Sequence, residues 1–254
     1  MPWEADTQTF RFVHRYVVLT EGPSDKEFFS KLALNRGLPP FDAPWPVHER
    51  EQAPQGAKEL RSLGKIHAML SAIRTYVGTI PELRQQIALV IVAVDSADIL
   101  PAKDWPQGFY KAVKEVRKAK GFGLPERPLQ IAAPEEQTAL PLAIMTVPAS
   151  DRDGGLETLY ADALFEKFDG IKACVENYFR TCPSRPNNWG AEKKGKGHFQ
   201  CIVSSTNKSN PALPPAWALS ERDGKPPLID ISDSAFNPLE NDLRTLCQQA
   251  GLLA

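Results

Sequence analysis

The chain has 254 residues, of which 30 are Lys or Arg and 31 are Asp or Glu, so its formal net charge is -1. This length predicts one large α/β domain, or one domain with an appendage, and argues against two independent catalytic domains. The balanced charge excludes a whole-protein attraction to nucleic acid, so any such contact must come from a local patch.

The cysteines and the N-terminal residues narrow the class of protein further. The four cysteines lie far apart without the Cys-x-x-Cys spacing typical of zinc sites, and we interpret them as reduced thiols. No basic segment precedes an apolar run at the N-terminus, and no stretch approaches the roughly 18 apolar residues of a membrane span. We therefore expect a cytoplasmic protein with no membrane partner.

The first predicted strand is the apolar run Tyr16 to Leu19, which stops just before Glu21. A helix follows, with Ser24 and Glu27 in the spacing of a capping box. Residues 41–56 are rich in Pro and polar side chains, and predict a loop with a short edge strand.

The clearest helix runs from Lys58 to Val77, where apolar residues recur every three or four positions. The run Ile87 to Val94 is apolar throughout and stops at Asp95, a pattern typical of a central parallel strand buried on both faces. Strand, helix and strand in this order predict a right-handed βαβ unit.

A Lys-rich helix is predicted from about Pro106 to Lys120, followed by strands at Leu129 to Ala132 and Leu142 to Val147. Two glycines then separate the last strand from another helix. The region from Pro183 to Pro227 is dense in Pro, Gly, Asn and Lys, and is predicted to be the least regular part.

Together these elements predict an α/β fold, with a mostly parallel, Rossmann-like sheet flanked by helices and an irregular Pro- and Lys-rich C-terminal region. We expect a single domain over residues 1–254. Its core is predicted at about 12–170, and a helical and loop extension at about 171–254.

Carboxylates follow three of the predicted strands. Glu21 follows the first strand, Asp95 and Asp98 follow a later one, and a third group follows Val147, namely Asp151, Asp153 and Glu157. Ligands of open α/β sheets bind outside the carboxyl ends of the strands, so neighbouring strands would bring these acids together. Converging carboxylates repel one another unless a cation neutralises them, and all-oxygen ligation favours Mg²⁺ or Mn²⁺, as one or two ions.

Taken singly, each acid has a simpler interpretation as a turn or helix-cap residue, and only the constellation is specific. Two segments carry a resemblance: YVVLTEGPSDKEFFSKL and VIVAVDSAD resemble the signature motifs of the Toprim (topoisomerase-primase) fold. In that fold a Glu ends the first strand and an Asp-x-Asp ends a later one. More narrowly, the chain resembles an uncharacterised bacterial Toprim-like family related to the nuclease domains of overcoming-lysogenization-defect proteins, from Tyr16 to about Leu246.

The resemblance implies roles for individual residues. Glu21 matches the Glu of the first motif, Asp25 the acid four residues later, and Asp95 the first Asp of the Asp-x-Asp. Glu157 matches the acid that opens the later helix. Lys196 resembles in placement a family Lys that would offset charge on a phosphoryl transition state. The implied catalytic residues are Glu21, Asp95 and Lys196, and the implied metal ligands are Glu21, Asp25, Asp95, Asp98, Asp153 and Glu157.

The second Asp of the Asp-x-Asp is a departure from the family pattern. Ala97 stands in its place, and the next acid, Asp98, comes one residue late. A three-residue step along a strand points a side chain to the opposite face, so Asp98 needs irregular backbone to reach a metal.

Two sets of lysines are candidates for contacts with a nucleic-acid backbone. Lys111, Lys114 and Lys118 lie on one side of their predicted helix. Lys193 and Lys194 lie in a stretch where bases and aromatic residues interleave, which we interpret as an irregular loop. A solvated helix face and a flexible surface loop are the simpler explanations.

These patterns predict a Mg²⁺-dependent phosphodiesterase or nuclease that acts on nucleic acid. The alternative is a Toprim-like module that has lost the Asp-x-Asp and binds nucleic acid, nucleotide or a protein partner without cutting. A third hypothesis is a subunit of a defence or repair complex that is active only with a partner. The sequence has no GxxxxGK[ST] loop, so an ATPase partner would be a separate chain.

Overall fold

Three parallel strands form the centre of the protein: β1 (Tyr16–Leu19), β2 (Leu89–Asp95) and β3 (Leu142–Val147), in the order β1-β2-β3. The computed structural model describes residues 12–43, 63–100, 104–168, 170–181, 189–207, 213, 215–221, 224 and 226–253. Every strand residue except Asp95 is buried, as expected for a parallel sheet covered on both faces. The predicted α/β class is confirmed.

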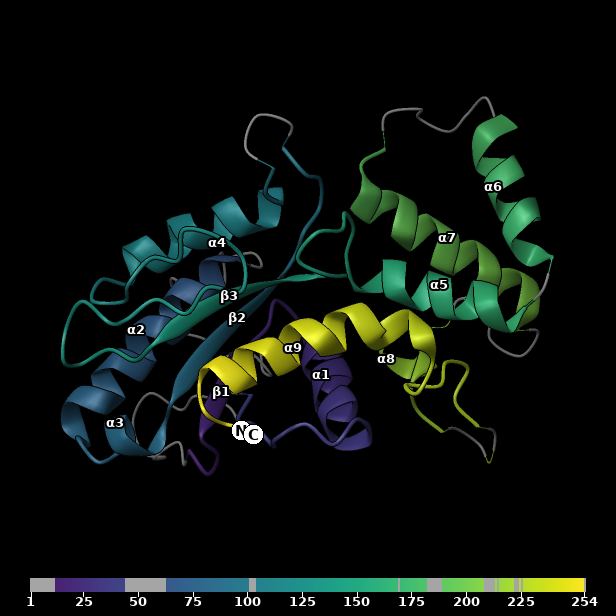
Figure 1. Ribbon diagram of the computed structural model, residues 1–254. Helices are drawn as coiled ribbons and strands as arrows, with labels where there is room; N and C mark the ends of the chain where they lie inside the picture. The colour runs from purple at the N-terminus through teal and green to yellow at the C-terminus, as the bar shows by residue number, and fades with distance from the viewer. Residues whose placement is uncertain are drawn as a thin grey trace, which may run out of the picture.

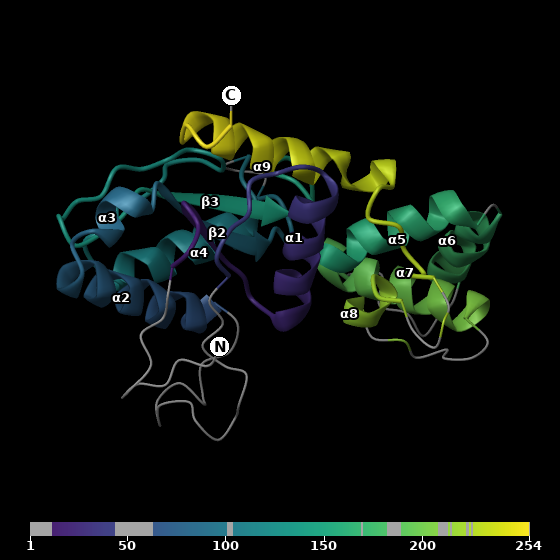
Figure 2. The ribbon, with the colours of Figure 1, turned by 90° about the horizontal axis from the view of Figure 1, so that it is seen from below.

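The two faces of the sheet are covered by different helices (Figures 1 and 2). Helices α2 (Leu63–Thr79), α3 (Leu83–Gln86) and α4 (Gln107–Lys118) pack on one face. Helices α1 (Pro23–Asn35) and α9 (Asn237–Gln249) pack on the other. Successive residues of each strand point to opposite layers, which is the period of two that a strand imposes.

The remaining helices gather beyond the carboxyl ends of the strands (Figure 1). They are α5 (Leu156–Lys167), α6 (Ile171–Thr181), α7 (Ala191–Thr206) and the short α8 (Pro215–Ala218), and a 3₁₀ turn η1 (Ser234–Phe236) leads on to α9. An aromatic cluster joins these helices to α1, formed by Phe28, Tyr160, Phe199 and Phe236. No helix in the described part of the chain is long and apolar enough to cross a membrane.

Helix α9 packs on the sheet through an apolar stripe, and polar contacts join its N-terminal end to the end of α1. Leu239, Leu243 and Leu246 are fully buried, with the spacing of one helix face. Arg36, at the end of α1, forms an ion pair of 3.2 Å with Glu240 and donates to the Asp233 carbonyl at 2.7 Å. The C-terminal helix is therefore part of the same core as the sheet.

Several predicted boundaries agree with the structure, and others do not. The strand Leu142 to Val147 is confirmed, and the helix predicted from Lys58 is confirmed from Leu63, since 58–62 lie outside the described residues. The strand predicted at Leu129 to Ala132 is wrong. Leu129 has a left-handed φ of 60°, which interrupts extended backbone, and Ala132 forms one isolated bridge to Leu142.

The capping box predicted at Ser24 is also wrong. Helix α1 begins at Pro23, and its N-cap is Gly22, two residues before Ser24, with no side-chain cap bond. Glu27 instead accepts a hydrogen bond from Ser220 Oγ at 2.8 Å and pairs with Lys31 at 3.1 Å. The predicted loop at 41–56 begins as expected, because Asp42 bridges Val17 at the sheet edge, and 44–56 lie outside the described residues.

The irregular loop predicted around residues 189–196 is wrong from Ala191 onward, where helix α7 begins. Two glycines made this stretch look unsuited to a helix, since Gly is about 1 kcal/mol less favourable than Ala. The structure explains one of them: a Cβ at Gly195 would lie 2.3 Å from Thr158 Oγ1. Gly195 therefore allows α7 to approach α5 closely, and buried contacts of Phe199 compensate for the weak propensity.

We predict that Leu243→Ala lowers the free energy of unfolding by about 2–5 kcal/mol, because it leaves a cavity between α9 and the sheet. Leu34→Ala is the matched control, since Leu34 is 82% exposed on α1 whereas Leu243 is 0% exposed. That control should stay within about 0.5 kcal/mol of wild type. Urea unfolding measures both, and equal losses for the two variants would contradict the docking of α9.

Candidate functional site

Glu21 and Asp95 meet where β1 and β2 end. Glu21 lies two residues after β1, and Asp95 is the last residue of β2. The Asp95 backbone N–H donates to Glu21 Oε1 at 3.2 Å. Because the two strands are hydrogen-bonded neighbours, acids that follow them are held side by side at the carboxyl edge of the sheet.

The Asp95 side chain lies directly against the start of α5. Its Oδ1 accepts the Leu156 backbone N–H at 3.3 Å. A Cβ on Gly155 would lie 2.8 Å from each of the three carboxyl atoms of Asp95, so this close approach requires glycine. The contact is reinforced by the loops, since Ala97 and Gly154 exchange backbone hydrogen bonds of 2.9 and 3.0 Å.

Three further acids lie in the first turns of helices. Asp25 is in the first turn of α1, Glu157 in that of α5, and Glu192 in that of α7. All three act electrostatically on Asp95, as does Glu21. The positive ends of helix dipoles favour acids at such positions. These five residues, Glu21, Asp25, Asp95, Glu157 and Glu192, are called the acidic cluster below.

Burial and repulsion between neighbouring acids raise the pKa values of four acids, namely Glu21, Asp25, Asp95 and Glu157. Burial, followed by the charges of Glu21, Asp25, Glu157 and Glu192, raises the pKa of Asp95 to about 8. Burial and Glu21 raise the pKa of Asp25 to about 7, although the Gly22 backbone opposes this. Burial is also the main reason that the pKa values of Glu21 and Glu157 are raised. The cluster therefore disfavours full ionisation.

Lys196 is a cation whose charge lowers the pKa values of Glu21, Asp25 and Glu157, against the larger effect of burial. Its Nζ lies 2.5 Å from Glu192 Oε1, one helical turn earlier on α7. Burial alone would lower the pKa of Lys196, but the hydrogen bond to Glu192 and the charges of Glu157 and Asp95 outweigh it and raise the pKa. The resemblance pointed to Lys196, whereas Glu192 was missed because its segment was interpreted as a loop. The spacing of Glu192 and Lys196 at i and i+4 was the available signal.

The Asp98 side chain contacts the start of α7, not the start of α5 where Asp95 lies. Ala97 has a φ of 57°, so the backbone after β2 is irregular, as Asp98 would need to reach a metal. The Asp98 carboxylate, however, accepts the Ala191 backbone N–H at 3.0 Å, at the start of α7, and its backbone carbonyl accepts the Gln107 N–H at 2.7 Å. Asp98 therefore joins the beginnings of α7 and α4.

Asp151 and Asp153 are not hydrogen-bonded to the acidic cluster within the described residues. Asp151 is exposed, and its charge acts on Asp242, which accepts the Ser150 N–H at 2.7 Å. Asp153 is half-buried, and its Oδ1 is buried with no hydrogen-bond partner among the described residues.

The candidate nucleic-acid lysines are all exposed. Lys111, Lys114 and Lys118 lie on α4, and Lys193 and Lys194 lie on the first turn of α7. Lys118 pairs with Glu115 at 2.5 Å, and the charge of Lys111 lowers the pKa of Glu21, against the larger effect of burial. In Figure 1 the first turns of α4 and α7 face each other across the loop that follows β2.

The acidic cluster offers the donors that a hard cation prefers, because all of its side-chain ligands are carboxylate oxygens. Burial first, and then the charges of neighbouring acids, raise the pKa values of Asp25 and Asp95, so a bound cation would favour their ionised forms. Among the described residues, no three His, Cys, Asp or Glu side chains are already placed as a ligand set. The chemistry thus fits Mg²⁺ or Mn²⁺, and binding would have to draw the carboxylates together.

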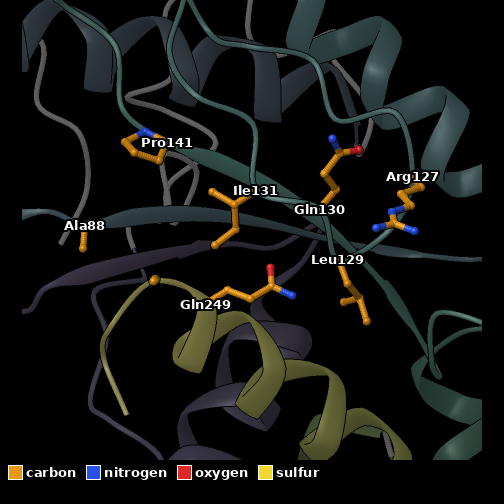
Figure 3. A pocket seen from close by; sticks show the side chains of 8 residues that line it. Ala88, Arg127, Leu129, Gln130, Ile131, Pro141 and Gln249 are labelled. Carbon is orange, nitrogen blue, oxygen red and sulfur yellow. The ribbon is translucent and has the colours of Figure 1, made fainter. Parts of the chain in front are cut away.

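A separate pocket of about 530 Å³ lies at the opposite end of the strands (Figure 3). Ala88 and Pro141, which precede β2 and β3, line it together with Arg127. In this view the side-chain amide of Gln249, at the end of α9, lies between Ile131 and Leu129. None of the residues predicted to carry chemistry lines this pocket, so the acidic cluster is a distinct site.

Comparisons with protein-family models, with curated proteins and with solved structures found no match to this chain. The resemblance to Toprim proteins therefore stays a prediction. Any function assigned to the chain depends on its own residues and their geometry.

We predict that the metal-free protein loses stability as the pH rises from about 5 to about 8. The pKa values of Asp25 and Asp95, about 7 and about 8 in the folded protein, exceed the value of about 3.9 for an unfolded Asp. The folded state therefore binds more protons in this window, and its free energy of unfolding falls with increasing pH.

Asp95→Asn should flatten this pH dependence, because Asn keeps an oxygen for the Leu156 N–H but carries no charge. Its Tm at pH 8 should rise by about 2–4 °C for each kcal/mol of repulsion removed. Thermal unfolding in a chelator measures the effect, with Asp151→Asn at an exposed position as the control. A variant with the same slope as wild type would contradict the assigned repulsion.

Asp98→Asn should be nearly silent in stability and in any response to divalent cations, because Asn and Asp cap helices about equally well. Asp98→Ala should cost about 0.5–2 kcal/mol, since it leaves the Ala191 N–H without its acceptor. Urea unfolding with and without Mn²⁺ distinguishes the two roles. If Asp98→Asn abolishes a Mn²⁺ response, Asp98 is a metal ligand instead of a cap.

Proposed function

We propose that this chain is a Toprim-like, divalent-cation-dependent phosphodiesterase or nuclease that acts on nucleic acid. The observation that carries the proposal is the acidic cluster itself, in which Glu21, Asp25, Asp95 and Glu157 share one partly buried site beside Lys196. Strongly perturbed carboxylates gathered at the functional edge of an α/β sheet are typical of catalytic and metal sites.

In this proposal Glu21, Asp95 and Glu157 hold the cation, and Asp25 assists at a second ion. A bound Mg²⁺ or Mn²⁺ would polarise the scissile phosphate and supply activated water. Lys196 is half-exposed at the rim of the cluster and would offset negative charge as it develops on the phosphoryl oxygens. Its ion pair with Glu192 orients the side chain in the absence of substrate.

The exposed lysines provide a route for the substrate. Lys111 and Lys114 on α4, and Lys193 and Lys194 on α7, lie on the two helices that begin beside Asp98. A phosphate backbone that follows these helices would pass the acidic cluster. Basic side chains of this kind supply affinity without sequence preference.

The alternative is a Toprim-like module that binds nucleic acid, nucleotide or a protein partner without cutting. The observation that favours it is the position of Asp98, which caps α7 while Ala97 occupies the place of the second motif Asp. The ligand set is then one carboxylate short. Glu192 lies in the acidic cluster as a replacement donor, which favours the enzyme.

A cytoplasmic setting and a protein partner belong to the same proposal. Cys174, Cys201 and Cys247 are free thiols, as in a reducing compartment. We propose that a defence or repair complex, with a separate ATPase chain, is the setting in which the activity is used.

Wild-type protein should cleave single- or double-stranded DNA or RNA only when Mg²⁺ or Mn²⁺ is present. Glu21→Gln and Asp95→Asn should each reduce cleavage by orders of magnitude, because each removes a ligand charge from the site. Gel-based cleavage of all four substrates measures this, with Asp151→Asn as a control that should match wild type.

A second arm separates cutting from binding. Lys196→Met should reduce cleavage while leaving Mn²⁺ binding in place, since Lys196 acts on the substrate. Nucleic acid that binds but stays intact with every cation would favour the module. Cleavage equal in wild type and in both carboxylate variants would refute the enzymatic proposal.

A further inference from the structure

Tyr160 is a buried residue of α5 that lies one turn beyond Glu157. Its side chain is 0% exposed, and its ring packs against Phe28, Phe199 and Phe236 at centroid distances of 5.9, 5.8 and 6.4 Å. The ring partners of Tyr160 among the described residues are all Phe, so packing alone does not call for a hydroxyl at this position.

The hydroxyl of Tyr160 has no hydrogen-bond partner among the described residues. A buried hydroxyl without a partner lowers stability, and such groups in native proteins usually bond to protein or ordered water. Tyr16, another fully buried tyrosine, satisfies this rule, because its hydroxyl donates to the Pro39 carbonyl at 2.7 Å. The two tyrosines therefore differ in whether the hydroxyl is hydrogen-bonded to a described residue, and this difference needs an explanation.

Tyr160 and its ring partner Phe28 each share a helix face with an acid of the acidic cluster. Tyr160 follows Glu157 by three residues, and its ring partner Phe28 follows Asp25 by three residues, so each pair shares a helix face. Burial, followed by the charges of Asp25, Glu157 and Glu27, raises the pKa of Tyr160. A neutral hydroxyl that can donate thus lies within electrostatic reach of Asp25 and Glu157, two acids of the cluster, and of Glu27.

We propose that the Tyr160 hydroxyl is a positioning group of the acidic site, which donates through an ordered water to the carboxylates of Asp25 and Glu157. The water accepts the hydrogen bond of the hydroxyl, for which the described residues offer no acceptor, and fixes how these carboxylates face the cation. This inference rests on the proposed cation site and adds a residue that the sequence motifs do not contain.

The test compares two isosteric variants, Tyr160→Phe and Tyr16→Phe. Tyr160→Phe should weaken Mn²⁺ binding by about 10–100-fold, the usual effect of removing a group that orients metal ligands. Tyr16→Phe should lower the urea midpoint of the metal-free protein and leave the Mn²⁺ affinity of the folded protein unchanged. Calorimetric titration with Mn²⁺ and urea unfolding in a chelator provide the two readouts.

Wild-type Mn²⁺ affinity in Tyr160→Phe would overturn the proposal, because the hydroxyl would then have no part in the site. A high-resolution crystal structure of the metal-free protein tests the water independently of any metal. A water between Tyr160 Oη and the two carboxylates supports the proposal even if wild type binds no Mn²⁺, in which case only the cation site fails. A Tyr160 hydroxyl with no ordered water bound to it would overturn the proposal.

Discussion

The contact of the Asp95 carboxylate with the backbone of Gly155 and Leu156 is the constraint on which the site depends. It fixes the end of β2 against the start of α5, at a distance that only a glycine permits. Once α5 begins there, Glu157 and Tyr160 follow on one side of the helix. The paired backbones of Ala97 and Gly154 hold the two loops in the same register.

This arrangement brings together more carboxyl groups than the nearby positive charges can keep ionised. Three helices begin at the acidic cluster, and their dipoles favour acids in the first turn, each by about 0.3–1 kcal/mol. That is too little to offset burial and mutual repulsion, because the pKa of Asp25, an acid in the first turn of α1, still reaches about 7. Binding and catalytic sites commonly keep such unfavourable interactions, and the stability of the surrounding structure offsets them.

Aromatic side chains pack below the acidic cluster and support it. Phe28 of α1, Tyr160 of α5 and Phe199 of α7 pack together below the first turns that carry Asp25, Glu157 and Glu192. The three helices are therefore fixed relative to one another by apolar contacts, while their acids repel. A rigid support under charged side chains is the arrangement that a preorganised site requires.

The sequence by itself determined the parallel strands and the acids that follow them, because an unbroken apolar run such as β2 is a local signal of a doubly buried strand. Only the tertiary structure decided which acids meet. Helix α7 was missed in the sequence because Gly195 lowers the helix propensity of this segment. That glycine is needed for the close contact with Thr158, and Glu192 was missed together with the helix. Asp98 accepts a hydrogen bond from the Ala191 N–H, which lies 93 residues away in the sequence. Local patterns report burial and periodicity, whereas these outcomes depend on pairs of residues that only folding brings together.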